Sequence, residues 1–487
     1  MFTRSMAPLM LTSLLAFSAA AQAQLPDAVK AQLAAANIPD TAVGALVLRG
    51  NDTLVSHLAD RPMQPASTLK ILTTLVGLEQ LTPVFRGRTE LRTAAPLVGD
   101  VLRGDLILRG GADMDLSGEV LTRMLQALRN QGIRQIDGRL VLDRELFSPA
   151  RPDLGVPPFD ESPDAYYNVI PDALLVNKNM LLLDLRSDGQ KVRLAMEPAL
   201  DNVTVESDFT LINGDCAKWE AGWKMPEVRR NGERLTVLLH GTFPRNCVAA
   251  NSINVLDRHD YLDRLFRLTW KQLGGSIGAD TVEGAGPLDS RLLTDHVARA
   301  LPELLRDINK PSDNTLARTL FLSLGSLQVD NYYGSKPLGG AGTGIGSTAL
   351  RADLTIRAWL RVKGIDDAGL VLENGAGLSR SERITAFQLG RLLQLGMESR
   401  WAPEFMGSLP IAGLDGTMRR RLLDSPAAGR ARIKTGALKD AVAIAGYVPD
   451  ANGKLCVVVA MINSDLVGAG RGRAVLDALI NWVARTQ

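Results

Sequence analysis

The chain has 487 residues and a formal net charge of +2 at neutral pH. A chain this long usually divides into more than one domain. Apolar residues make up 46% of it and charged residues 22%, which is typical of a globular protein. So small a charge gives no electrostatic reason to expect a nucleic acid as partner.

The first 23 residues have the pattern of an export signal. Arg4 supplies a positive start, residues 6–20 are apolar, and Ala21-Gln22-Ala23 is a small-residue cleavage site. The apolar run is shorter than the ~20 residues that a membrane-spanning helix needs, which disfavours an anchor. We therefore expect a periplasmic mature chain without a transmembrane segment, and leave a loose membrane association open.

Three cysteines are present. Cys216 and Cys247 share one polar, turn-rich region, and in an exported protein we expect them to form a disulfide. Cys456 stands in an apolar, strand-like run and is expected to be an inert core thiol. No group of cysteines and histidines has metal-ligand spacing, so we expect neither a metal nor a cofactor.

In chain order, residues 41–49 and 53–57 predict two strands around Gly50-Asn51-Asp52, a hairpin signal. Residues 65–76 are apolar and helix-like, with Pro65 at the start. Between about residues 91 and 288, short alternating segments indicate a β-rich region. We interpret residues 91–288 as an insertion of one or two small, nested domains.

Helical patterns resume after this region, with residues 297–309 apolar at helical spacing. Residues 431–436, 441–448 and 454–463 predict a three-stranded meander, and residues 474–484 a closing helix. Antiparallel strands and helices from both ends of the chain indicate an α+β fold. Residues 24–90 and 289–487 would together form this outer domain.

Three short motifs carry candidate chemistry: Ser67-Thr68-Leu69-Lys70, Ser312-Asp313-Asn314 and Lys434-Thr435-Gly436. Ser67 and Lys70 are three positions apart on a predicted helix and so project from one face. A serine hydroxyl needs a base to become nucleophilic, and Lys70 can be that base if burial lowers its pKa. The alternative is a helix cap beside a surface lysine.

The second motif lies in a turn between two predicted helices. Ser312 can relay a proton there, and Asn314 can hold a substrate amide or the basic lysine. The alternative is a plain helix cap, because caps favour the same residue types.

The third motif ends a strand-like run. Lys434 and Thr435 can bind a carboxylate, and Gly436 lets a substrate backbone approach the strand closely. The backbone N–H groups of Ser67 and Ala437 can form an oxyanion hole. The alternative for this motif is an edge strand with a solvated lysine.

Taken together, the motifs resemble those of the D-alanyl-D-alanine carboxypeptidase/endopeptidase family, the class C low-molecular-mass penicillin-binding proteins (peptidase family S13). The long insertion between Lys70 and Ser312 is the hallmark of that class. The similarity extends over residues 309–314, 375–380, 408–418, 434–440 and 445–448.

This resemblance implies a serine β-lactamase/transpeptidase-like domain, in which helices flank an antiparallel sheet, interrupted by two nested domains. It implies cleavage of the terminal D-Ala-D-Ala bond, or of D-alanyl cross-links, in peptidoglycan stem peptides. Ser67 would attack the carbonyl with Lys70 as base. Ser312 and Lys434 would then pass the proton towards the leaving amine.

The resemblance also assigns substrate contacts. Asn314 would position the stem-peptide amide, and Lys434 and Thr435 would bind the terminal carboxylate. β-Lactam antibiotics, as mimics of the D-Ala-D-Ala end, would be covalent inhibitors. One departure is Ala437, where relatives often carry Ser or Thr. Two alternatives stay open: a serine β-lactamase or esterase on the same scaffold, and a non-catalytic cell-wall binding protein.

Overall fold

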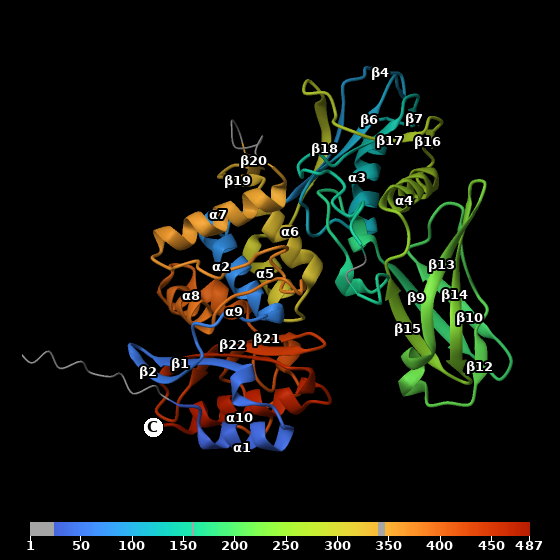
Figure 1. The fold of residues 1–487 in the computed structure, drawn as a ribbon. Helices are drawn as coiled ribbons and strands as arrows, with labels where there is room; N and C mark the ends of the chain where they lie inside the picture. The colour runs from blue at the N-terminus through green and yellow to red at the C-terminus, as the bar shows by residue number, and fades with distance from the viewer. Residues whose placement is uncertain (1–23, 158–159, 339–345) are drawn as a thin grey trace, which may run out of the picture.

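The computed structural model describes residues 24–157, 160–338 and 346–487. The predicted export signal, residues 1–23, lies outside the described residues. Figure 1 shows a helical layer above a sheet that both ends of the chain build, and a strand-rich region to one side that the middle of the chain forms. The α+β prediction is confirmed.

The sheet that both ends of the chain build, here called the main sheet of the outer part, has five strands. All are antiparallel, in the order β2-β1-β23-β22-β21. The predicted hairpin is confirmed, with Gly50 in its turn at φ +59°, a conformation that glycine adopts without strain. The predicted meander near the end is confirmed too. The strands are β1 (Val43–Arg49), β2 (Asp52–His57), β21 (Arg432–Ala437), β22 (Ala441–Pro449) and β23 (Leu455–Asn463).

Both faces of this sheet are covered. Along β1, Ala45 and Val47 face one core while Leu46 and Leu48 face another, because successive side chains of a strand point to opposite faces. Helices α1 (Asp27–Ala36) and α10 (Arg471–Arg485) pack on the first face. The larger helical layer covers the second (Figure 1).

Helix α2 (Lys70–Leu81) runs through the middle of the helical layer. It is buried along nearly its whole length and contacts α5, α6, α8 and α9. This packing fixes the position of residues 66–69, which directly precede the helix. The other helices of the layer are α5 (Leu301–Asn309), α6 (Asn314–Leu324), α7 (Thr348–Val362), α8 (Ala386–Glu398) and α9 (Ala402–Ser408).

One helix prediction is wrong at its start. The expected helix over residues 297–309 begins only at Leu301, because β18 (Arg291–Val297) is a strand. This strand pairs with β3 (Arg88–Thr93) in a second five-stranded sheet of order β17-β8-β6-β3-β18. The remaining strands of that sheet are β6 (Leu106–Gly111), β8 (Leu140–Asp143) and β17 (Thr281–Glu283).

Helices α3 (Gly118–Asn130) and α4 (Arg258–Gln272) pack beside this second sheet. A small four-stranded sheet adjoins it, and β19 pairs with β20 in the helical layer. These short strands are β4 (Leu97–Val98), β5 (Val101–Leu102), β7 (Gln135–Ile136), β16 (Ser276–Ile277), β19 (Leu327–Asp330) and β20 (Gly334–Pro337).

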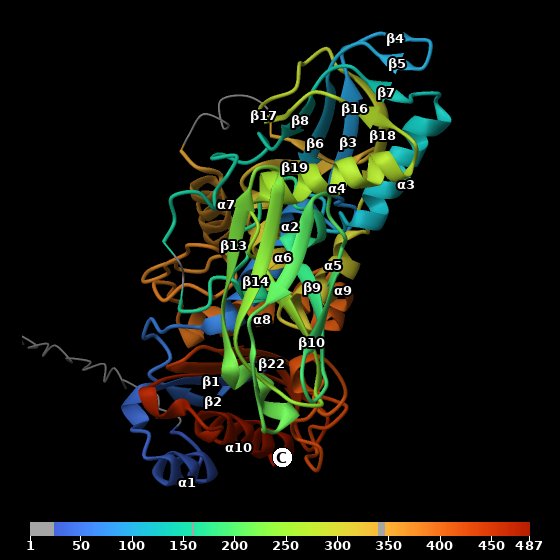
Figure 2. The ribbon, with the colours of Figure 1, turned by 90° about the vertical axis from the view of Figure 1, so that its right-hand side faces the viewer.

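Two further sheets, of orders β10-β9-β15 and β11-β14-β12 with β13 on β14, stand side by side in Figure 2 and share one apolar core. The predicted disulfide between Cys216 and Cys247 is present here, and Cys456 is buried with a free thiol. The strands are β9 (Leu181–Ser187), β10 (Val192–Glu197), β11 (Val203–Ser207), β12 (Thr210–Ile212), β13 (Trp223–Asn231), β14 (Arg234–Pro244) and β15 (Val248–Ile253).

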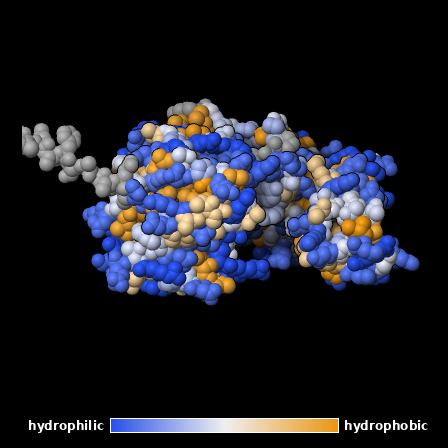
Figure 3. Space-filling view, turned by 60° about the horizontal axis from the view of Figure 1, so that its bottom comes forward, coloured by the Kyte–Doolittle hydropathy of each residue, from blue (hydrophilic) through white to orange (hydrophobic). Residues whose placement is uncertain are grey.

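Short 3₁₀ turns join several of these elements. They are η1 (Asp40–Ala42), η2 (Ala66–Leu69), η3 (Tyr166–Asn168), η4 (Val176–Asn179), η5 (Cys216–Gly222), η7 (Gly416–Met418) and η8 (Asp465–Val467). None of the helices in the described ranges has the length and apolar character to cross a bilayer. Figure 3 shows a mostly hydrophilic face, hollowed between the outer part and the strand-rich part.

Candidate active site

Ser67 sits in the 3₁₀ turn η2, directly before α2. The preceding residue, Ala66, has a φ of +47°, which is strained for a residue with a side chain. Two glycines pack tightly around this turn: a Cβ on Gly377 would lie 1.8 Å from the Ala66 carbonyl oxygen, and one on Gly436 would lie 2.9 Å from the Ser67 nitrogen. The backbone at Ser67 is therefore held from two sides.

Lys70 begins α2, and its side chain is fully buried. Its Nζ lies 3.0 Å from Ser67 Oγ. The same atom donates hydrogen bonds to Asn314 Oδ1 at 2.7 Å and to the Ala376 carbonyl at 2.6 Å. A neutral amine has two N–H groups and one lone pair, so these two acceptors leave the lone pair facing the serine hydroxyl.

Burial lowers the pKa of Lys70 from its ordinary value to about 7. The carboxylates of Asp313 and Glu382 oppose this lowering, and the guanidinium of Arg318 adds to it. Burial dominates because an ammonium loses its hydration in the interior. Near neutral pH the amine is thus populated enough to accept a proton.

Glu382 is a buried carboxyl that belongs to no recognisable sequence motif. It accepts hydrogen bonds from the backbone N–H groups of Glu373, Asn374 and Gly375, and burial raises its pKa. These bonds hold the loop that presents the Ala376 carbonyl to Lys70.

The second motif occupies the turn between α5 and α6, as predicted. Asp313 is the N-cap of α6, and its side chain accepts a hydrogen bond from Leu316 N. Ser312 has a φ of +67° and accepts a 2.8 Å hydrogen bond from Lys434 Nζ. Asn314 contacts Lys70 through its oxygen and donates through Nδ2 to the Tyr167 carbonyl at 3.0 Å.

Lys434, on the edge strand β21, is buried rather than solvated. Besides Ser312 it donates to the Thr435 carbonyl at 2.7 Å. Its pKa lies well below the ordinary value, first because of burial and second because of the charge of Lys70. Each serine thus contacts one buried lysine, and neither lysine is held by a carboxylate within hydrogen-bond distance among the described contacts.

Thr435 lies at the surface of the cleft and donates a 2.7 Å hydrogen bond to Thr417 Oγ1 in η7. Thr417 carries no motif of its own and was missed as an individual residue, although it falls within the segment 408–418 noted for its resemblance. The two hydroxyls lie together beside β21, which is an outermost strand of the main sheet.

One cavity of about 850 Å³ brings these groups together. Of the predicted site residues, it is lined by Ser67, Ser312, Asn314, Thr435 and Ala437. Lys70 and Lys434 lie buried beneath it, and Gly436 backs the Ser67 turn. Cys216 and Cys247 belong to the strand-rich part and take no part in the cavity.

The strand-rich part also contributes to the cavity wall, with residues that the sequence did not single out. They are Asp160, Glu161, Ser162, Tyr166 and Tyr167. Nothing in the sequence marks these residues, since no local motif accompanies them and only folding brings them to the cleft. Arg380, Leu438 and Lys439 also line this cavity.

This geometry suits acyl transfer. It offers a hydroxyl next to a neutral amine, a second hydroxyl next to a second buried amine, and a cleft open to a peptide. Within the described ranges, no cluster of three or more His, Cys, Asp or Glu side chains has a metal-binding arrangement.

Comparisons with known proteins define the class. The profile of the "D-Ala-D-Ala carboxypeptidase 3 (S13) family" matches residues 25–486, so the chain belongs to this family. The D-alanyl-D-alanine carboxypeptidase DacB of Haemophilus influenzae is 26% identical over 429 residues, which cover 86% of this chain and 84% of the relative.

A second relative, the D-alanyl-D-alanine carboxypeptidase of Actinomadura sp. (strain R39), is 28% identical over 437 residues, covering 86% of this chain and 75% of the relative. Among solved structures, penicillin binding protein 4 (dacB) from Haemophilus influenzae superposes with a TM-score of 0.74. The identity there is 24%, and the match covers 91% of this chain and 96% of that one. The likeness shows that the fold is shared.

Proposed function

We propose that this chain is a serine DD-peptidase that cleaves D-alanyl-D-alanine ends, D-alanyl cross-links or both in peptidoglycan. Family membership supports the reaction class. The observation that carries the proposal is the 3.0 Å contact between Ser67 Oγ and the buried amine of Lys70, whose pKa is lowered to about 7.

In the acylation step, Ser67 Oγ attacks the carbonyl carbon of the scissile D-Ala-D-Ala bond while Lys70 takes the hydroxyl proton. The carbonyl oxygen becomes an oxyanion, which the backbone N–H groups of Ser67 and Ala437 stabilise. The C–N bond then breaks, and the leaving amine must gain a proton. The proton that Lys70 took from Ser67 passes to this amine through Ser312 and Lys434, which are hydrogen-bonded at 2.8 Å, so that Lys70 is neutral again when the acyl-enzyme has formed.

Three residues hold the substrate. Asn314 positions the stem-peptide amide, and Lys434 and Thr435 bind the terminal carboxylate beside the edge strand β21. Thr417 supports this role, because its hydroxyl lies 2.7 Å from that of Thr435. A water molecule then hydrolyses the acyl-enzyme and frees Ser67.

The same geometry makes the protein a target of β-lactams. A structure of penicillin binding protein 4 from Haemophilus influenzae is described as complexed with a novel β-lactam. For this chain we infer a covalent adduct on Ser67, since the strained β-lactam carbonyl offers the same electrophile as the D-alanyl bond.

We further propose that the two ends of the chain form one catalytic domain around two nested inserted domains. The pairing of β3 with β18 supports borders near residues 88 and 297, slightly outside the 91–288 expected from sequence. The export-signal pattern of residues 1–23 and the disulfide support a periplasmic location.

Release of D-alanine tests the proposal. The mature protein is incubated with a stem pentapeptide ending in D-Ala-D-Ala and, as a stereochemical control, with one ending in D-Ala-L-Ala. We expect release of the terminal alanine, whichever its configuration, from the first peptide alone, and none from the Ser67→Ala variant. Equal activity of wild type and variant would remove Ser67 from the mechanism, and binding without release would favour the non-catalytic alternative.

A further inference from the structure

Three consecutive residues adopt the left-handed conformation in the turn before β9. Their φ values are 49° for Asn177, 53° for Lys178 and 57° for Asn179. Asparagine tolerates this region, but lysine rarely enters it. Such strain persists only where the surroundings enforce it, and it often marks a functional position.

Asn177 is clamped to two helices of the inserted region. Its Oδ1 accepts a 2.9 Å hydrogen bond from the backbone N–H of Gly118 at the start of α3. Its Nδ2 lies 3.1 Å from the hydroxyl oxygen of Tyr261 in α4, and that hydroxyl donates in turn to the Met180 carbonyl at 2.7 Å. The first residue of the turn therefore has little freedom.

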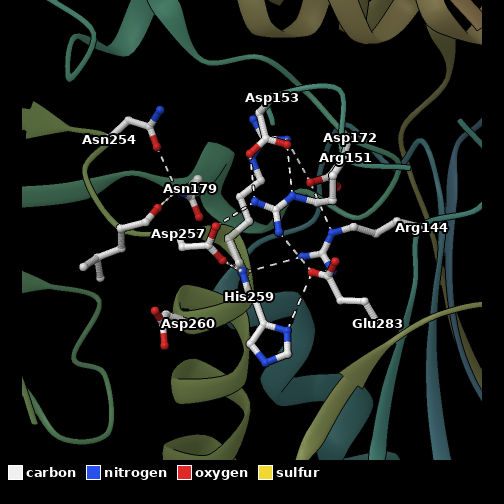
Figure 4. Close-up of polar contacts among 12 residues, drawn as sticks. Arg144, Arg151, Asp153, Asp172, Asn179, Asn254, Asp257, His259, Asp260 and Glu283 are labelled. Atoms are coloured by element: carbon white, nitrogen blue, oxygen red, sulfur yellow. Dashed lines mark hydrogen bonds and ion pairs between the residues drawn. The ribbon is translucent and has the colours of Figure 1, made fainter. Parts of the chain in front are cut away.

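Asn179 is clamped from the other side. Its Nδ2 donates to Asn254 Oδ1 and to the Leu256 carbonyl, both at 2.8 Å (Figure 4). A network of ion pairs lies beside it. There, Asp172 is fully buried and pairs with Arg144 at 3.2 Å and with Arg258 at 2.9 Å. The segment that leads into the turn is thus fixed before Lys178 is reached.

Lys178, between the two clamped residues, extends to the catalytic part. Its ammonium forms an ion pair with Oδ2 of Asp313. The other oxygen of Asp313 caps α6 through Leu316 N, so both oxygens of this carboxylate are held. Asp313 stands between Ser312 and Asn314, which contact the two buried lysines of the active site.

The surroundings of this ion pair are acidic. A cavity of about 510 Å³ adjoins it, lined by the charged residues Asp113, Asp115, Asp172, Lys178, Arg299, Asp307 and Asp313. His296 binds Asp113, and Arg299 is engaged by Asp115 and Asp307. Among the residues that line this cavity, Lys178 is the cation that pairs with Asp313.

We propose that Lys178 is a positioning residue for the DD-peptidase reaction. It links the inserted region to the second motif, Ser312-Asp313-Asn314, and so holds Ser312 and Asn314 against their lysine partners. The inference rests on the proposed function. It gives the insertion a role in catalysis beyond the shape of the cleft, since the strained turn η4 presents its one lysine to the one carboxylate of that motif.

The first test is the rate of acylation by benzylpenicillin. We expect Lys178→Met to lower the second-order rate constant by about tenfold, and Lys178→Arg to stay within about twofold of wild type. Lys178→Gly removes the ammonium but relieves the left-handed strain, so it should fold at least as well and still react slowly. Lys336→Met is the matched control. Its ion pair with Asp330 has side-chain exposures of 53% and 18%, close to the 41% and 19% of Lys178 and Asp313.

The pH profile of acylation tests whether the charge of Lys178 acts on the active site or whether the residue has a merely structural role. The charged groups that act on Lys70 are Asp313, Glu382, Arg318 and Lys434. Without Lys178, the charge of Asp313 is less compensated and favours protonated Lys70. The acid limb of the acylation profile should therefore move up by roughly 0.5 pH unit in Lys178→Met, and stay in place in Lys178→Arg and Lys336→Met.

The possible results for the Lys178 variants and for wild type distinguish the positioning role of Lys178 from the proposed function. Wild-type rate and profile in Lys178→Met would overturn the positioning role while leaving the DD-peptidase proposal intact. A rate loss that Lys178→Gly fully restores would also overturn it, because backbone strain alone would then explain the loss. If wild type itself forms no adduct, the proposed function fails instead.

Discussion

Lys434 Nζ donates a 2.8 Å hydrogen bond to Ser312 Oγ across 122 positions of sequence. This contact joins the edge strand of the main sheet to the turn between α5 and α6. Lys70 in turn joins Ser67 to Asn314. The site is therefore two serine–lysine pairs, and each lysine is buried in the protein interior.

The lowered pKa of Lys70 predicts how acylation depends on pH. The neutral amine accepts the proton, so the rate should be level above pH 7 and fall about tenfold per unit below it, as Lys70 becomes protonated. Stopped-flow measurement of benzylpenicillin acylation between pH 5 and 9 checks this. A rate that still rises about tenfold per unit up to pH 9, as an amine with the ordinary pKa of lysine would give, would contradict the assignment of Lys70 as base.

Burying a lysine lowers the free energy of unfolding, and the proposed reaction needs two buried lysines. Lys434 is fully buried, and its pKa is lowered by burial and by Lys70. Lys434→Met removes this burden with a side chain of similar length, so we expect the free energy of unfolding to rise by about 1 kcal/mol. Urea denaturation measures it, and acylation should fall at least 100-fold. A less stable variant would show that the two hydrogen bonds of Lys434 outweigh its desolvation.

The glycine behind the Ser67 turn has no room for a side chain. A Cβ on Gly377 would meet the Ala66 carbonyl oxygen at 1.8 Å, and its φ is +75°. Gly377→Ala should cost about 3 kcal/mol of stability and displace Ser67, so acylation should be lost in the folded fraction.

Gly50→Ala is the control for this variant. Gly50 also has a positive φ, +59°, but nothing lies within 4 Å of the added Cβ. We expect a loss of about 1–2 kcal/mol from backbone strain and unchanged acylation. Thermal melts and adduct formation compare the two. Equal effects would mean that close packing on the Ala66–Ser67 backbone is unimportant.

The disulfide should stabilise the inserted region without touching the chemistry. Cys216 and Cys247 close a loop of sequence separation 31, for which loop-closure entropy predicts about 3–4 kcal/mol. The double change to serine should lower the urea midpoint and leave the acylation rate at low denaturant unchanged. A large loss of rate would show that the two-sheet core governs the active site.

Short-range sequence patterns predicted those parts of the fold and of the site that neighbouring residues form. The hairpin around Gly50, the turn that carries Ser312 and the final meander all follow from short-range patterns. The types and the order of the three motifs along the chain also predicted that their residues would meet in one site. The start of the helix expected over residues 297–309 was misplaced because residues 291–297 combine apolar and charged residues without clear alternation, and only pairing with β3 makes them a strand.

Other parts of the site depend on tertiary contacts and have no sequence signal. Tyr167 reaches Asn314 through a backbone carbonyl, which any residue type supplies. Glu382 acts by holding a loop, and Lys178 acts through a strained turn that asparagines on both sides make possible. Burial of Lys434 on an edge strand was equally hidden, since an exposed lysine is the commoner outcome there.

The central claim is that Ser67 forms an acyl-enzyme, and intact-protein mass after incubation with benzylpenicillin tests it most directly. We expect a stable one-to-one adduct on the mature wild-type protein and none on Ser67→Ala. Rapid loss of the antibiotic without a lasting adduct would favour a β-lactamase. An unmodified protein beside intact antibiotic would contradict the acyl-enzyme mechanism.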